Sequence, residues 1–559
     1  MLFTSLRQTR DRLAASTTTW TLMLLAYVAV VVILLAPVLL TSVGVDDRNW
    51  ILERGPMNDG SAWEAVWRPL TRALDFERSP RGTALAISDR SVVALLTMKI
   101  AITFSIPPMI VWAALKLTLF ALSIVAVWAF LRQVTFRDDA GDVRGLAPRS
   151  IAFITIALPV TIAIGAKSQN LSSLNGWNHY PTLTWGTFAG YFLFAALVLK
   201  LSHLLQRNFR VWIVVPVALL MVISGIAINL SYEMVALTIP ISVLVLLLQP
   251  LAAGKTWWHR WRAKIIVLAP LLVSFTSLFI WIRYLMSQRE CLATTSCYTG
   301  TVLEIRPRTV FYNFVGAMPG NNADLVHRQA ARIGRPFPDP GPTSVVLAIV
   351  AVLLMWALWA SWKARERVPV RTPGSASGPA GGDTRGLLGV ILLALCIAAG
   401  SSVLTGITER AVEKIQTPLI SYRSSVVTWS ALALAALVIV LLLLRSRVRP
   451  LAWVSAAVLT IVITVAIAMY FPRNVMSAQV NRQSPATRYA DTLQLELALG
   501  GTSTTADERR CREISAELER RGLPPTAPSG RTTDSAYRAF EFYHGQPYCS
   551  TGAGKSATP

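Results

Sequence analysis

The chain has 559 residues, of which 53% are hydrophobic and only 15% are charged, and its formal net charge is +23. Several uncharged apolar runs approach 20 residues, the length that an α-helix needs to cross a bilayer. This composition excludes the ordinary soluble classes and predicts an all-α polytopic membrane protein. The excess of Lys and Arg lies largely between apolar runs, where it sets topology, and it forms no nucleic-acid-binding motif.

The first apolar run covers residues 19–43, follows a segment with several arginines and is too long for a signal-peptide core. The positive-inside rule therefore predicts a cytoplasmic N-terminus. After the run come two adjacent carboxylates, Asp46 and Asp47, with Trp50 at the depth of a membrane interface. We therefore expect both carboxylates at the extracytoplasmic face.

Charge bias along the rest of the chain predicts ten further crossings, and hence about 11 transmembrane helices. The further predicted spans are residues 107–131, 151–166, 182–204, 211–228, 234–250, 265–285, 343–362, 386–404, 426–444 and 451–470. A long first outer loop, 44–105, contains two stretches predicted to be interfacial helices, and a second outer loop covers 286–342. The predicted domains are a transmembrane domain, 1–471, and an extracytoplasmic tail, 472–559.

The cysteines give an independent test of this topology. Cys396 lies inside a predicted span, and the other four lie in segments that the charge bias assigns to the outside. Because disulfides persist in oxidising compartments, two local pairs are predicted. These pairs are Cys291 with Cys297 and Cys511 with Cys549. The tail is predicted to be a small α-rich domain, with helices over 491–499 and 507–521, that packs against the outer loops.

The sequence lacks the phosphate-binding Gly-x-x-x-x-Gly-Lys motif, the His-Glu-x-x-His metal motif and a nucleophile elbow. Its five histidines are scattered along the chain. Polar side chains gather instead at the outer ends of the predicted spans, and we expect them to meet in an outer cleft. They are Asp46, Asp47, Lys99, Lys167, His179, Glu233, Arg283, Arg306, Arg308, Tyr422 and Arg423.

This arrangement resembles the GT-C superfamily of polyprenyl-phosphate-sugar-dependent glycosyltransferases. The resemblance rests on the cytoplasmic N-terminus, the acidic pair Asp46-Asp47 after the first span, the long first outer loop, the many further spans and the soluble outer tail. It covers the whole chain in architecture, and its motif is two residues long. The resemblance implies inverting transfer of a sugar from a polyprenyl-phosphate donor to a cell-envelope glycan or glycolipid. It also implies an integral protein of a bacterial-type plasma membrane with an extracytoplasmic active site.

Within this resemblance, Asp46 or Asp47 is the general base that takes the proton of the acceptor hydroxyl. Partial burial and mutual repulsion of the two charges suit them to that role. The leaving phosphate needs cations and hydrogen-bond donors. The candidates for contact with donor phosphate or sugar are Arg423, Tyr422, Lys99, Arg283, Arg306, His179 and Glu233. No metal site and no cofactor are predicted, although some members of the superfamily use a divalent ion at the acidic motif.

Other interpretations stay open at the level of the sequence. Acidic residues that follow a span are often merely solvated. A lipid or glycan transporter would carry charges at mid-membrane, and the predicted spans hold few. An O-antigen polymerase or ligase would use Arg and His of a large late outer loop, and a structural scaffold would need no catalytic group. The loop 286–342 holds Arg306, Arg308, His327, Arg328, Arg332 and Arg335.

Overall fold

The computed structural model is almost entirely helical over the residues that it describes. The described residues are 17–41, 43, 45–74, 84–137, 142–167, 177, 180–251, 256–288, 303–321, 323–332, 334–365, 383–418, 422–446, 448–483, 485–520 and 531–550. Cys291, Cys297 and His179 lie outside the described residues, and so does the side chain of Asp46. The predicted disulfide between Cys291 and Cys297 and the role proposed for His179 therefore stay predictions.

In the described part of the chain, nine helices of 20 to 35 residues are apolar and long enough to cross a membrane. The chain is therefore an all-α polytopic membrane protein. The membrane helices are α2 (Thr17–Leu39), α6 (Pro108–Gln133), α8 (Thr187–Arg207) with the π-helical η1 (Thr182–Gly186) before it, α9 (Val211–Leu230), α11 (Trp257–Ser287), α15 (Pro342–Arg365), α16 (Thr384–Gly406), α18 (Ser425–Leu444) and α19 (Arg449–Gln483).

Two of the predicted spans, 151–166 and 234–250, are shorter apolar helices. They are α7 (Pro148–Ile164) and α10 (Thr238–Leu248), the latter preceded by the 3-10 helix η2 (Glu233–Leu237). Because neither is long enough to count as a span by length alone, the total of 11 crossings stays a prediction. The helix α19 continues through Pro472, so the predicted domain boundary at 471 falls inside a helix.

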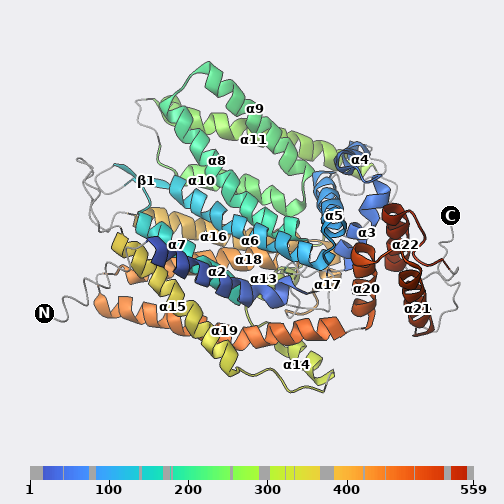
Figure 1. Ribbon diagram of the computed structural model, residues 1–559. Coiled ribbons are helices and arrows are strands. Elements are labelled where there is room, and N and C mark those ends of the chain that lie inside the picture. The colour runs from blue at the N-terminus through green and yellow to red at the C-terminus, as the bar shows by residue number, and fades with distance from the viewer. Residues whose placement is uncertain are drawn as a thin grey trace.

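The two ends of the helix bundle are covered by different structures. One end carries a small antiparallel hairpin in which Thr135 pairs with Gly145. The other carries α3, α5 and the helices of the tail (Figure 1). Outside the membrane helices, the elements are β1 (Thr135–Arg137), β2 (Val143–Gly145), α3 (Val45–Met57), α4 (Ala62–Leu74), α5 (Ala84–Phe104), α13 (Pro307–Gly316), α14 (Ala323–Arg332), α17 (Glu409–Lys414), α20 (Pro485–Leu499), α21 (Thr504–Arg520) and α22 (Arg531–His544).

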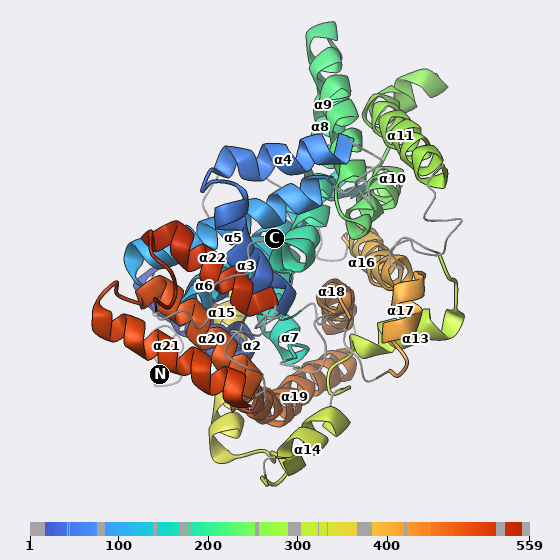
Figure 2. The same ribbon diagram turned by 90° about the vertical axis from the view of Figure 1, so that its right-hand side faces the viewer.

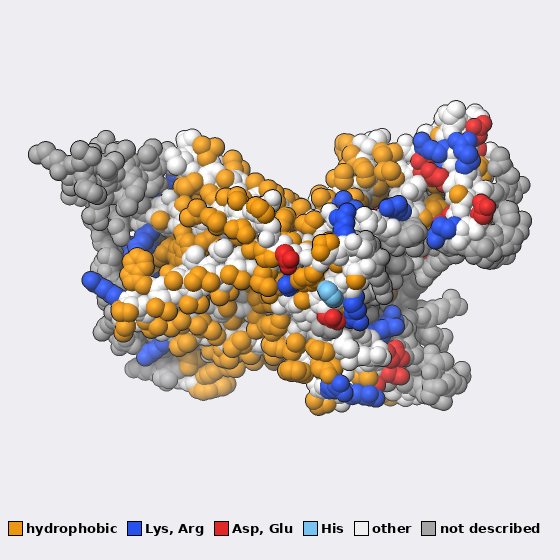
Figure 3. Space-filling model, turned by 90° about the horizontal axis from the view of Figure 1, so that it is seen from below, with side chains coloured by type: hydrophobic (Ala, Val, Ile, Leu, Met, Phe, Trp, Pro, Cys, Tyr) orange, Lys and Arg blue, Asp and Glu red, His pale blue; other side chains and the backbone are white. Residues whose placement is uncertain are grey.

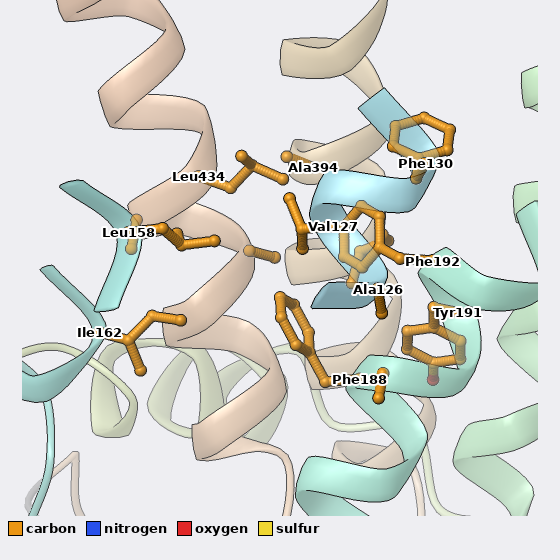
Figure 4. Close-up of a cluster of buried hydrophobic side chains, with 14 of the residues drawn as sticks. Ala126, Val127, Phe130, Leu158, Ile162, Phe188, Tyr191, Phe192, Ala394 and Leu434 are labelled. Carbon is orange, nitrogen blue, oxygen red and sulfur yellow. The ribbon is translucent and has the colours of Figure 1, made fainter. Parts of the chain in front are cut away.

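The main core lies where α6, α7, α8, α16 and α18 meet (Figure 4). Phe188 and Phe192 of α8 contact each other edge to face within it, with ring centroids 5.1 Å apart. Hydroxyl groups connect α16 and α18, since Ser401 and Ser402 lie 2.9 and 3.0 Å from the hydroxyl of Thr428. Such bonds satisfy polar groups that lipid cannot satisfy, and they fix the packing of neighbouring spans.

The flank of the bundle is apolar, whereas charged side chains gather toward its ends (Figure 3). Large aliphatic side chains on α15 and α19, such as Leu353, Val454 and Ile461, are more than half exposed. A surface of this kind is unfavourable in water and favourable against lipid tails. It therefore supports placement of this belt within the membrane.

The tail packs against α3 and α5 rather than standing alone, and these helices belong to the segment predicted to be the first outer loop. Ile51 and Leu52 of α3 share one apolar cluster with Leu497 of α20 and Phe540 of α22. Figure 2 shows α20, α21 and α22 grouped with α3 and α5 on one side of the bundle end. The predicted disulfide between Cys511 and Cys549 is confirmed, with Cα atoms 5.1 Å apart. The tail has one helix more than predicted, α22.

Candidate functional site

The carboxylate of Asp47 is buried in the first turn of α3, with only 2% of the residue exposed. Its Oδ2 accepts a hydrogen bond from the backbone N–H of Tyr180, at an N···O distance of 2.8 Å. Its Oδ1 lies 3.7 Å from Nη2 of Arg90 on α5. Burial of a charged carboxylate is tolerated only with such partners. The interpretation of Asp47 as a merely solvated residue is therefore wrong.

Two guanidinium groups and two aromatic rings form a layer beside this carboxylate. The Cζ of Arg90 lies 4.2 Å from the ring centroid of Trp50 and 4.5 Å from that of Tyr180. Arg54 covers the ring of Trp50 at 3.8 Å. Among the described residues, Nη2 of Arg90 has no hydrogen-bond acceptor. This atom is instead 3.7 Å from Oδ1 of Asp47, so the layer holds buried positive charge next to the carboxylate.

Tyr180 has an unusual backbone conformation at the centre of the site. Its φ is +53°, in the left-handed region that bulky residues rarely adopt. Its N–H binds Asp47, and its ring contacts both Arg90 and, at 4.9 Å, the guanidinium of Arg423. The π-helical turn η1 begins two residues later. A residue in such a backbone conformation costs ~1–3 kcal/mol of stability, which the surrounding structure must offset. Conformations of this kind, and π-helical turns, are found preferentially at functional sites.

Arg423 is a buried cation surrounded by tyrosines, with 9% of the residue exposed. Its Nη1 donates to the hydroxyl of Tyr232 at 2.8 Å. Its Cζ lies 4.9 Å from the ring centroid of Tyr180 and 6.0 Å from that of Tyr422. Within the described part of the chain, its Nε finds no acceptor. A guanidinium that is buried among rings and hydroxyl groups is electrostatically suited to an anionic ligand.

A small pocket of about 30 Å³ lies beside Arg423. It places three predicted site residues together, because Glu233, Tyr422 and Arg423 all line it. Arg410 and Thr408 contribute to the same wall. The volume is about that of one water molecule, so the pocket is closed to larger groups in this conformation.

Further charged groups surround Asp47. Lys116 is buried on the membrane helix α6, where its Nζ lies 3.5 Å from the carbonyl oxygen of Leu39 and interacts electrostatically with Asp47. Asp89 neighbours Arg90 on α5 and hydrogen-bonds with the side chain of Thr182. Asp47 therefore belongs to a network of charged residues that includes Lys116 on the membrane helix α6.

Three predicted cations do not join this network. Lys99 is exposed on α5, about two and a half turns from Arg90. Arg283 is exposed near the end of α11 over the ring of Phe279. Arg306 pairs with Glu304 at 2.5 Å, with most of its side chain exposed. None of the contacts found for Arg283 and Arg306 in the described residues is with Asp47 or Arg423, and their placement at outer span ends stays a prediction.

The basic residues of the second outer loop are dispersed over α13 and α14. Most of them are exposed, and they contact neighbouring groups one at a time. The contacts are Arg308 with Tyr312, Arg328 with Asp324, Arg335 with Gln479, and His327 with Phe337. The side chain of Arg332 lies outside the described residues. The described part of this loop therefore forms no cluster of Arg and His.

A metal centre has no support in the described residues, since no three His, Cys, Asp or Glu side chains among them lie close enough to hold an ion. No protein-family model, curated protein or solved structure matches the chain. The geometry of Asp47, Tyr180 and Arg423 is therefore the principal guide to function.

The sequence did not single out Arg54, Arg90, Lys116, Tyr180 or Tyr232 as site residues. Two of them carried a usable signal. Lys116 is a single charge inside an apolar run, and Arg90 lies in an otherwise largely apolar helix. Charged residues in such positions are costly and commonly functional. Tyr180 and Tyr232 gave no comparable signal, because aromatic residues at span ends are usually interface anchors.

Proposed function

We propose that this protein is an inverting glycosyltransferase that moves a sugar from a polyprenyl-phosphate donor to a hydroxyl group of an envelope glycan or glycolipid. One observation carries the proposal: Tyr180 joins a buried carboxylate, Asp47, to a buried cation surrounded by tyrosines, Arg423. Transfer from a phosphate-linked sugar needs a proton acceptor next to a group that stabilises the departing phosphate. The two requirements meet at this residue.

In the proposed reaction the acceptor oxygen attacks the anomeric carbon of the donor sugar. The bond between that carbon and the phosphate oxygen breaks, and its electron pair leaves with the polyprenyl phosphate. The proton of the acceptor hydroxyl passes to a carboxylate of the acidic pair, either Asp47 or its neighbour Asp46. Attack from the face opposite to the phosphate inverts the configuration. No further reactant is needed to balance the step.

The cations would act on the leaving phosphate. Arg423 and Arg90 both contact the ring of Tyr180, and each has a guanidinium nitrogen without a hydrogen bond among the described residues. A charge-assisted bond from either guanidinium to a phosphate oxygen would strengthen as negative charge develops. Because the pocket beside Arg423 measures only about 30 Å³, donor binding must displace side chains such as Tyr422.

The rival functions have less support in the described residues. A polymerase-like or ligase-like site would gather the Arg and His of the second outer loop, and these are dispersed and exposed. A transporter would use buried charge within the membrane, and Lys116 is such a charge. Its interaction with Asp47 instead connects it to the outer site.

The test is turnover of Asp46→Asn and Asp47→Asn proteins in lipid nanodiscs with a polyprenyl-phosphate sugar. We expect one of them to lose roughly 10²–10⁴-fold in turnover at unchanged donor affinity, because Asn keeps the size but cannot accept the proton. Asp59→Asn is the matched control, since Asp59 is an exposed acid of the same outer segment. Normal turnover in both aspartate variants would contradict the proposal.

A second substitution tests the phosphate contact. Arg423→Ala should weaken donor binding by roughly 10-fold to 100-fold, whereas Arg423→Lys should recover part of it by restoring the charge without the planar fork. Binding is measured by titration of the donor lipid. Unchanged donor affinity in Arg423→Ala would place the phosphate elsewhere.

A further inference from the structure

A second cavity lies at the hairpin end of the bundle, away from the acidic pair. Its volume is about 780 Å³. Its walls are formed by the ends of α6, α8 and α10, by β1 and by the first turns of α16, and they include Phe130, Leu199, Val245 and Leu393. Figure 1 shows β1 and α3 at opposite ends of the bundle. The topology predicted from charge places this cavity at the cytoplasmic leaflet.

Two arginines border the cavity and are held side by side. Arg137 donates from Nη2 to the carbonyl oxygen of Leu251 at 3.0 Å. Arg385 donates from Nη1 to the carbonyl oxygen of Arg137 at 3.4 Å. Both side chains are exposed, so a ligand at the cavity mouth can reach the two guanidinium groups. The pair concentrates positive charge at the rim of an otherwise apolar space.

The third feature is a buried amide in the cavity lining. Gln249 is only 4% exposed, and in the described part of the chain neither its Nε2 nor its Oε1 has a hydrogen-bond partner. Its position is fixed from the backbone, because its carbonyl oxygen accepts from Nζ of Lys264 at 2.6 Å. Buried side-chain amides nearly always find a partner, so this one has donor and acceptor capacity left for a ligand atom in the cavity.

We propose that this cavity binds an anionic glycerophospholipid of the inner leaflet. Its phosphate would lie between Arg137 and Arg385, its acyl chain against the apolar walls, and its glycerol or ester oxygens beside the amide of Gln249. A soluble phosphate would not use the apolar walls, and a zwitterionic lipid would bring its own cation to the arginines. Basic pockets between spans at the cytoplasmic surface are typical sites for anionic head groups. The inference is independent of the proposed glycosyl transfer.

The test is native mass spectrometry of the full chain after delipidation and incubation with phosphatidylglycerol or phosphatidylcholine. We expect the wild type to retain phosphatidylglycerol in preference. The Arg137→Gln/Arg385→Gln double variant should lose about 30-fold in affinity for phosphatidylglycerol and keep its weak affinity for phosphatidylcholine. Gln249→Leu should lose about tenfold. Equal retention of the two lipids by the wild type, or wild-type retention by the double variant, would overturn the proposal.

Matched controls separate this site from general surface charge. The Arg210→Gln/Arg449→Gln double variant removes the same charge from exposed positions outside the cavity, at the same predicted face. It should retain phosphatidylglycerol like the wild type, and a loss equal to that of the cavity variant would contradict the site. Glycerol phosphate at the same concentration should not displace the lipid. Displacement by glycerol phosphate, or equally well by polyprenyl phosphate, would refute a glycerophospholipid site.

Discussion

Tyr180 is the residue on which the proposed site depends most. Its backbone N–H donates to Asp47, and its ring contacts the guanidinium groups of both Arg90 and Arg423. The left-handed φ aims the N–H at the carboxylate while the ring faces the cations. The surrounding packing must supply the free energy that this conformation costs.

Replacement of the Tyr180 ring should therefore separate aromatic character from size. Tyr180→Leu keeps an apolar side chain but removes the π face, and we expect the KM for the donor to rise by roughly tenfold or more, since each cation–π contact contributes ~0.5–2 kcal/mol. Tyr180→Phe should stay within about threefold of the wild type. Steady-state kinetics with varied donor lipid provide the measurement. Equal effects of Leu and Phe would show that the ring has no electrostatic role.

At the scale of secondary structure, α20 fastens the tail to α3 through an ion pair. Oδ1 of Asp491 lies 3.3 Å from Nη2 of Arg48, which also donates to the carbonyl oxygen of Val43 at 3.0 Å. Burial raises the pKa of Asp491 to about 6, even though Arg48 and Arg482 act to lower it. The segment that follows the first membrane helix is thereby coupled to the tail.

This pair predicts a pH dependence of stability. Native Asp491 keeps its proton up to about pH 6, whereas the unfolded chain releases it near pH 4, so the native state binds more protons between these values. The free energy of unfolding should therefore fall as pH rises through this window, by about 1 kcal/mol because a third of the side chain is exposed.

The measurement is Tm against pH from 4 to 8 for wild type, Asp491→Asn and the control Glu508→Gln, whose carboxylate is exposed on α21. Asp491→Asn should lack this component of the pH dependence, although the unpaired Arg48 will lower its Tm overall. Glu508→Gln should follow the wild-type curve. Identical pH profiles for wild type and Asp491→Asn would show that the carboxyl titrates normally.

At the scale of the whole molecule, two sets of charged structures lie at opposite ends of the helix bundle. The hairpin and the arginine-bordered cavity lie at one end, and the acidic pair and the tail lie at the other (Figure 1). The apolar flank between them is the surface that lipid would cover (Figure 3). This separation agrees with the sides that charge bias assigned to the two sets, and the direction of insertion stays a prediction.

Topology reporters test the direction. A fusion after Gly145, at the end of β2, should report the cytoplasm, because basic residues flank the hairpin. A fusion after Gln483, at the end of α19, should report the outside. Truncation after Arg262 gives a second cytoplasmic control. The same compartment for Gly145 and Gln483 would contradict the fold, and exchanged compartments would invert the proposed active face.

The sequence by itself determined properties that depend on local composition. The length of the apolar runs predicted the membrane helices. The placement of the cysteines in segments assigned to an oxidising compartment predicted the disulfide between Cys511 and Cys549. The acidic pair was found because it interrupts the apolar and basic pattern after α2. The expectation that Lys99, Arg283 and Arg306 lie near outer span ends rests on the same local pattern of hydropathy and charge, and it stays a prediction.

Only the tertiary structure decided which of these side chains meet. Asp47 and Tyr180 are in contact although they are 133 residues apart in the sequence, and Arg423 and Tyr232 are in contact although they are 191 residues apart. Which side of a membrane helix contacts its neighbours is decided by packing. A run that is hydrophobic on all sides does not show in its sequence which side that is. Arg90 was therefore missed although it belongs to the site. Tyr180 was missed because its conformation is imposed by packing between distant helices.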